Sequence, residues 1–204
     1  MRESKPKKEK SHAERLSQFW TDPEMAQRIV DWAALPEGAR VLEPSAGAGN
    51  IVRCFPAHCQ VTAVELDPAV AQGLPGLHPH LDVVVGDLLK AWPEATTQLF
   101  DVAVMNPPYE DGADGTHVVE ALRLCHRVVC FVRANFCWGV ARYHGIFRWA
   151  KVTRRVILVR RPPFCGPADA GHTAMHDYQI LELARRDWER GARDADEVKE
   201  EIWL

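Results

Sequence analysis

Four short apolar segments, each closed by a polar residue, constrain the fold of this chain more than any other feature. The segments lie at residues 41–42, 60–65, 81–85 and 100–105, and each reads as a buried strand. The polar residues that follow or close them are Glu43, Glu65, Asp87 and Asn106. Because the carboxyl ends of parallel strands meet at one edge of an open α/β sheet, where ligands bind, we expect these side chains to share a site.

A glycine loop follows the first segment and is expected to lead into a helix. Gly47 and Gly49 remove side chains where backbone must approach a ligand, and a helix N-terminus offers free N–H groups to an anion. The loop lacks the full G-x-G-x-x-G spacing, so alone it is a weak signal. Glu65 lies near the separation at which an acidic residue accepts from ribose hydroxyls, although a solvated strand end would also suit it. Together they predict a nucleotide site.

The fourth segment ends in Asn106, Pro107, Pro108 and Tyr109. An exocyclic amine conjugated to a ring or carbonyl is a poor nucleophile because its lone pair is delocalised. If the Asn106 amide oxygen and the Pro107 carbonyl each accept one of its hydrogens, the lone pair is freed to attack a methyl donor, with Tyr109 stacked on the planar target. The alternative is an ordinary turn after a strand.

Whole-chain quantities bound the class of protein. A length of 204 residues with 47% hydrophobic content suits one domain, and a net charge of −3 gives no sign of bulk nucleic-acid binding. Six cysteines without a C-x-x-C pair favour a reduced cytoplasmic protein, and no apolar stretch is long enough for a membrane span. Residues 1–14 are expected to be a disordered basic tail, either solubilising or nucleic-acid binding, and residues 187–204 a charged helix or tail.

The order of these motifs resembles the N6-adenine DNA methyltransferases in which the cofactor motifs precede the catalytic one. The resemblance rests on residues 19–23, 42–49, 64–67, 86–89 and 106–109. It implies a Rossmann-like class I fold over residues 15–186, with a mostly parallel sheet and an antiparallel hairpin from residues 152–161 and 177–184. It also implies S-adenosyl-L-methionine (AdoMet) as cofactor.

The resemblance assigns roles to individual residues. Asn106, Pro107, Pro108 and Tyr109 would be catalytic, and Tyr109 and Phe164 would sandwich the target base. The residues expected to bind AdoMet are Trp20, Thr21, Pro23, Glu43, Pro44, Ser45, Ala46, Gly47, Gly49, Glu65, Leu66, Asp87, Leu88 and Asn106. Asp22 interrupts the family's usual aromatic-Thr-Pro order, which weakens the assignment of Thr21.

The expected partner is DNA, or else RNA, with the target base flipped out of its stack. We expect no separate target-recognition domain, because only a short segment follows Ala184. Target choice would then rest on loops 110–117, 136–145 and 165–176, on the arginine-rich strand 152–161, or on a partner subunit or oligomer.

Three other functions fit the same motifs. Adenine N6-methylation of RNA and N5-methylation of a protein glutamine both act on a planar, delocalised nitrogen. A catalytically silent AdoMet-binding subunit is the third, although an intact 106–109 motif argues against it. His172 and His176 lie four residues apart but lack an evident carboxylate partner, so no metal site is expected.

Overall fold

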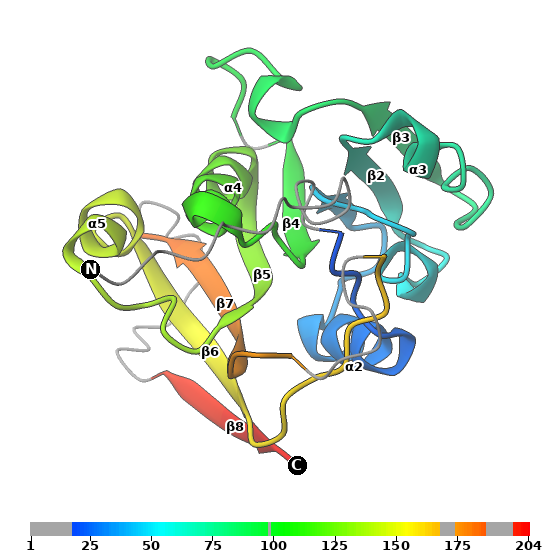
Figure 1. Cartoon of the computed structure of the whole chain (residues 1–204). Helices are drawn as coiled ribbons and strands as arrows, with labels where there is room; N and C mark the ends of the chain where they lie inside the picture. The colour runs from blue at the N-terminus through cyan, green and yellow to red at the C-terminus, as the bar shows by residue number, and fades with distance from the viewer. Residues whose placement is uncertain (1–17, 98, 168–173, 187–197) are drawn as a thin grey trace, which may run out of the picture.

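The computed structural model describes residues 18–97, 99–167, 174–186 and 198–204. The sheet has eight strands in the order β3-β2-β1-β4-β5-β7-β6-β8 (Figure 1). Their bounds are β1 Arg40–Glu43, β2 Gln60–Glu65, β3 Leu81–Val85, β4 Phe100–Met105, β5 Cys125–Arg133, β6 Ala150–Leu158, β7 Tyr178–Arg185 and β8 Lys199–Trp203. β1 to β5 are mutually parallel, and β7 runs antiparallel between β5 and β6. The predicted Rossmann-like fold and its antiparallel pair are confirmed.

The helical segments are shorter and less regular. The α-helices are α2 Pro23–Ala33, α3 Pro68–Ala71, α4 Ala113–Leu124 and α5 Val140–Arg142; the short turns are η1 Val52–Cys54, η2 Leu88–Lys90, η3 Glu110–Gly112 and the π-helical η4 Tyr143–Phe147. α2 begins as its sequence predicts, because the Asp22 carboxylate accepts from the backbone N–H of Glu24 and Pro23 occupies the first turn.

The core forms two layers, one on each face of the sheet. Val102 and Val104 point from β4 toward α2, whereas Ala103 and Met105 point toward α4, as the two-residue period of a strand requires. The central strands are buried on both faces, so their sequences read as continuous apolar runs. Figure 1 shows α2 and α4 lying on either side of the sheet.

The C-terminal end differs from its expected structure. Residues 1–17 and 187–197 lie outside the described part, but Lys199–Trp203 forms β8, not a helix, parallel to β6. Glu200 bonds Arg155 at 3.1 Å and Glu201 lies 3.6 Å from Arg154, while Arg28 stacks on Trp203. The sequence of this segment is rich in charged residues and was therefore predicted to be a helix or tail. Glu200 and Glu201 pair with arginines of β6, which are distant in sequence, so the strand could not be predicted from the segment alone.

The same pairs bear on the arginine-rich strand, which was one of the segments expected to choose the target. Arg154 also bonds the buried Glu182 of β7 and lies over Trp32, with its Cζ 4.0 Å from the ring centroid. Arg155 is held by Glu200. The charges of Arg154 and Arg155 are therefore paired within the protein, so these two side chains are not free to bind a nucleic acid.

No helix within the described residues is long and apolar enough to cross a bilayer.

Candidate active site

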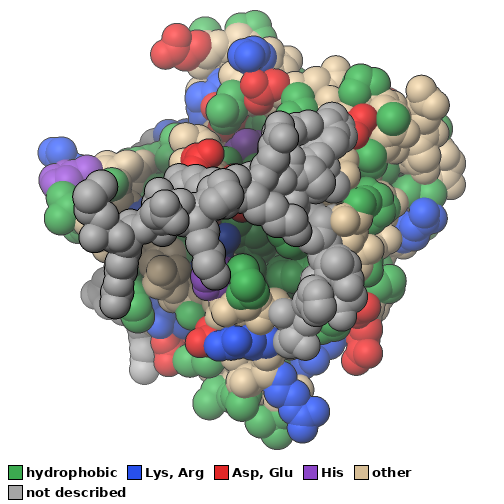
Figure 2. Space-filling model, viewed as in Figure 1, with side chains coloured by type: hydrophobic (Ala, Val, Ile, Leu, Met, Phe, Trp, Pro, Cys, Tyr) green, Lys and Arg blue, Asp and Glu red, His purple; other side chains and the backbone are tan. Residues whose placement is uncertain are grey.

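A cleft of about 440 Å³ opens at the carboxyl edge of the parallel strands. The predicted residues that line it are Trp20, Ser45, Gly47, Glu65, Leu66, Asp87, Asn106 and Pro108. Trp20 precedes α2, and the others follow or close β1, β2, β3 and β4, so the fold brings together motifs that span almost ninety residues of sequence. Figure 2 shows a hollow near the middle of the viewed face with hydrophobic side chains inside it.

Other residues predicted to form the site do not line the cleft. Thr21 is buried and pairs through its backbone with Phe164, and Pro23 lies on the exposed first turn of α2. The remainder, Glu43, Pro44, Ala46, Gly49 and Pro107, are buried. Leu88 is 2% exposed and packs in the core, whereas its neighbour Leu89 is 45% exposed and lines the cleft.

The glycine loop is shaped by close contacts. Gly47 has φ +54°, and a Cβ there would lie 2.5 Å from Cδ1 of Trp20, so only glycine fits beneath this ring. The Gly47 N–H donates to one carboxylate oxygen of Glu65 at 2.7 Å, and the Asp67 N–H donates to the other at 2.8 Å. Glu65 therefore ties the loop to the end of β2 and lines the cleft with the same carboxylate. Burial raises the pKa of Glu65.

Two side chains at the start of the glycine loop have buried polar atoms without a hydrogen-bond partner among the described residues. These atoms are the Ser45 hydroxyl and one oxygen of Glu43. Burial, reinforced by the nearby Glu65, raises the pKa of Glu43 well above its ordinary range. The cleft is also lined by Asp87, Glu110 and Asp111. This surplus of carboxylates suits AdoMet, which carries a sulfonium and an ammonium group.

The Asn106 side chain is held in one orientation. Its amide nitrogen donates to the Phe19 carbonyl at 2.9 Å, and its amide oxygen accepts from the Tyr109 hydroxyl. Because a carbonyl can only accept, the bond to Phe19 fixes which end of the amide carries the oxygen. That oxygen has a second lone pair, so it can accept one further hydrogen from a target amine.

The predicted base sandwich is not formed in this structure. Tyr109 is 5% exposed, and its ring contacts Phe164 edge-on, with centroids 6.4 Å apart and planes at 62°. Phe131 and Tyr178 complete the buried aromatic cluster, and the Tyr109 hydroxyl lies 2.9 Å from the Phe131 carbonyl. A base could stack between Tyr109 and Phe164 only if the rings parted, so their stacking role remains a prediction.

Tyr109→Phe tests the contact between Tyr109 and Asn106. The ring is kept, but the hydroxyl that bonds the Asn106 amide is lost. Because Asn106 is predicted to be catalytic, kcat for methyl transfer is expected to fall about 2- to 10-fold, the value of one neutral hydrogen bond. AdoMet affinity, measured by calorimetry, is expected to stay unchanged. Tyr143→Phe is the control, because Tyr143 is 57% exposed. Equal kcat in all three proteins would assign no orienting role to the hydroxyl.

Several cleft residues were not predicted as cofactor ligands. They are Gln18, Phe19, Leu89, Glu110, Asp111, Ala113 and His117. Phe19 belongs to the predicted motif 19–23 and Gln18 directly precedes it, which is the sequence signal that could have found them. Loop 110–117 was expected to choose the target, yet it lines the same cleft as Glu65 and Asp87. His117 lies against the Ala113 carbonyl, and burial lowers its pKa.

No group of three His, Cys, Asp or Glu side chains in the described ranges is arranged to hold a metal ion. His172 lies outside those ranges.

Known proteins that match this chain are named for the methylation of adenine or of ribosomal RNA. The family model for ribosomal RNA adenine dimethylase matches residues 8–111, just over half of the chain. A dimethyladenosine transferase of Schizosaccharomyces pombe is 40% identical over 97 residues, which cover 44% of this chain and 30% of the relative. A probable ribosomal RNA small subunit methyltransferase A of Pyrobaculum aerophilum is 36% identical over 99 residues, 47% of this chain and 40% of the relative.

Among solved structures, the 23S rRNA methyltransferase ErmE superposes with a TM-score of 0.60 at 24% identity, covering 82% of this chain and 70% of that one. At 24% identity this similarity shows a shared fold and nothing about substrate. The chain spans only 30% to 40% of the length of the two curated relatives.

These matches correct two expectations. The expected resemblance to DNA N6-adenine methyltransferases was wrong, because the matching family and the curated relatives are named for ribosomal RNA or dimethyladenosine. The expectation of DNA as partner was wrong for the same reason. The hypothesis drawn from residues 106–109 concerned a planar amine, which adenine carries in both DNA and RNA. The predicted cofactor is confirmed, since the matching family is of the AdoMet-dependent type.

Proposed function

The chain belongs to the ribosomal RNA adenine dimethylase family, and on this basis we propose that it transfers methyl groups from AdoMet to N6 of an adenine in ribosomal RNA. The observation that carries the proposal is the fixed Asn106 amide at the edge of the cleft, with its oxygen able to accept from one more donor. Adenine N6 is the planar exocyclic amine of RNA to which such an acceptor is suited.

Catalysis in this proposal depends on placed acceptors. The Asn106 oxygen accepts one amine hydrogen and the Pro107 carbonyl accepts the other, which draws the nitrogen toward tetrahedral geometry and directs its lone pair at the methyl group. Neither acceptor changes its protonation state, so the rate gain comes from alignment and from stabilising positive charge on the attacking nitrogen. AdoMet supplies the electrophilic methyl group when bound.

The cofactor would be held by residues of the cleft. Glu65 would accept from the ribose hydroxyls and Asp87 from the adenine amine, with Leu66 and Leu89 offering apolar surface beside them. The Ser45 hydroxyl, buried without a partner in the described structure, is the polar group best placed to gain a hydrogen bond on binding.

A competition experiment tests the substrate class. The protein is incubated with labelled AdoMet and equal masses of deproteinised ribosomal RNA, single-stranded DNA, duplex DNA and cell protein, and each fraction is counted. We expect label in the RNA, and its loss when Asn106→Ala replaces the wild type. Label in protein would support glutamine methylation, and label in no fraction would support a silent AdoMet-binding subunit.

A further inference from the structure

Positive charge is segregated along this chain. Residues 121–168 contain ten Lys and Arg residues and no Asp or Glu, although the net charge of the whole chain is −3. Most of the arginines in this stretch find carboxylates elsewhere in the described structure. The pairs are Arg123 with Glu120, Arg127 and Arg154 with Glu182, Arg142 with Asp114, Arg155 with Glu200, and Arg161 with Asp177.

Arg133 differs from these arginines, and it lies beside the catalytic motif. It is the last residue of β5, the strand next to β4, and its Cζ is 5.2 Å from the centroid of the Tyr109 ring. Within the described residues no carboxylate lies within ion-pair distance of its guanidinium, which instead bonds the side chain of Tyr178. Its Nε is buried and has no partner there.

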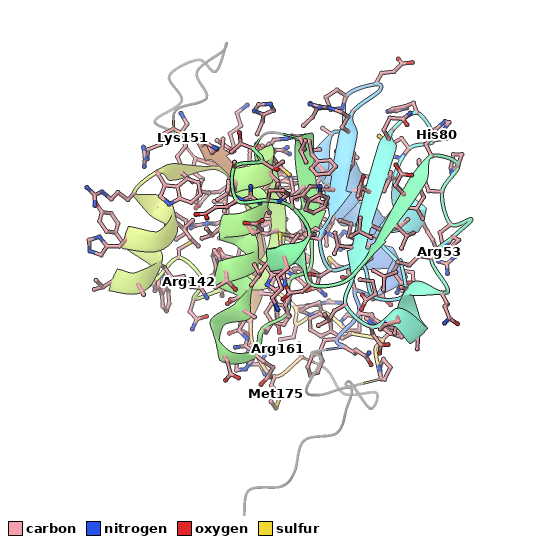
Figure 3. All side chains as sticks on the ribbon, turned by 90° about the horizontal axis from the view of Figure 1, so that it is seen from above. Arg53, His80, Arg142, Lys151, Arg161 and Met175 are labelled. Carbon is pink, nitrogen blue, oxygen red and sulfur yellow. The ribbon has the colours of Figure 1, made fainter. Side chains whose placement is uncertain are left out.

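The acids on the neighbouring elements are already engaged. Asp114, at the start of α4, bonds Arg142, and Asp177, just before β7, bonds Arg161 at 2.9 Å. Figure 3 shows that Arg142 and Arg161, which hold these two carboxylates, lie on the same side of the molecule, whereas Lys151 lies on the opposite side. A half-buried guanidinium without a counter-charge is costly, so an anionic ligand would be stabilising here.

We propose that Arg133 binds a phosphate of the RNA strand next to the target adenine; this inference rests on the proposed function. A guanidinium offers a planar fork of donors that matches two phosphate oxygens, and Arg133 is only half-buried, so part of this fork is open to a ligand. Contact with Tyr109 places the fork beside Asn106, where the backbone of an inserted nucleotide must pass. Arg133 does not line the acidic cofactor cleft, which separates its ligand from AdoMet.

The test uses Arg133→Gln, with Arg53→Gln as the control. Arg53 is exposed and lies on a different side of the molecule from Arg142 and Arg161 (Figure 3). Binding of a fluorescein-labelled, adenine-containing single-stranded RNA is measured over a range of KCl concentrations. For Arg133→Gln we expect Kd to rise about tenfold or more at low salt and the slope of log Kd against log salt to fall by about 0.7 to 1. Arg53→Gln and the AdoMet Kd of both variants are expected to match the wild type.

A structural role for Arg133 would give a different pattern. Loss of thermal stability with an unchanged RNA Kd and salt slope would show that the guanidinium only packs on Tyr109, and a weakened AdoMet Kd would assign it to the cofactor; either result overturns the proposal. Arg133→Lys keeps the charge and should restore most of the salt slope. If the wild-type protein does not bind the RNA, the proposal that Arg133 binds an RNA phosphate is also overturned. RNA binding that depends on Arg133, without methyl transfer to RNA, would instead count against the proposed function alone.

Discussion

Asn106→Ala is expected to lower kcat for methyl transfer to ribosomal RNA by about a hundredfold or more, the cost of losing one placed acceptor of developing charge. The bonds to Phe19 and Tyr109 hold the amide in one orientation, and in the proposed mechanism its oxygen acts on the target amine in the transition state. AdoMet affinity should change little. Single-turnover transfer from labelled AdoMet measures the rate, and calorimetry measures the affinity.

The exposed Asn135 supplies the control for Asn106. Asn135→Ala should transfer methyl groups at the wild-type rate and unfold at the wild-type temperature. A near-normal rate in Asn106→Ala would refute the proposed mechanism. A large loss of AdoMet affinity in that variant would place Asn106 in cofactor binding instead of catalysis.

Glu65→Ala is expected to weaken AdoMet binding by about 10- to 100-fold. Charged hydrogen bonds contribute roughly 1.5 to 3 kcal/mol each, and this carboxylate would serve the ribose while also holding the Gly47 N–H. Calorimetry measures the change, with exposed Glu37→Ala as the control. Unchanged affinity in Glu65→Ala would move the ribose site elsewhere.

The same carboxylate predicts a pH dependence. Burial raises the pKa of Glu65, so it takes up a proton at a higher pH than an ordinary glutamate does. AdoMet affinity that depends on the charged form is therefore highest above the raised pKa and declines as pH falls through it. Glu65→Gln should bind more weakly at neutral pH and lose this part of the pH dependence.

The sequence predicted the parallel half of the fold well because its signals are local. The apolar run before Asn106 and the alternation before Glu65 each identify a strand, and the residue that ends each strand lies at the ligand-binding edge by topology alone. β8 could not be predicted in this way, since its pairing depends on arginines of β6 more than forty residues earlier.

The site was only partly predictable for a similar reason. Tyr109 was expected to face a target base, but its ring lies in an aromatic cluster assembled from β5, β7 and the segment before β7. Its bond to Asn106 joins residues three apart, yet no periodicity in the sequence indicates it. The identity of the target polymer was not predictable from the motif, because adenine in DNA and adenine in RNA present the same amine to Asn106.

Nucleoside analysis tests the central claim most directly. Ribosomal RNA is incubated with AdoMet and either wild-type protein or Asn106→Ala, digested to nucleosides and examined by mass spectrometry. The account predicts N6-methylated adenosine, and N6,N6-dimethyladenosine on longer incubation, with the wild type and neither product with Asn106→Ala. Methylation confined to another base, to the ribose or to protein glutamine, or equal adenosine methylation by both proteins, would contradict it.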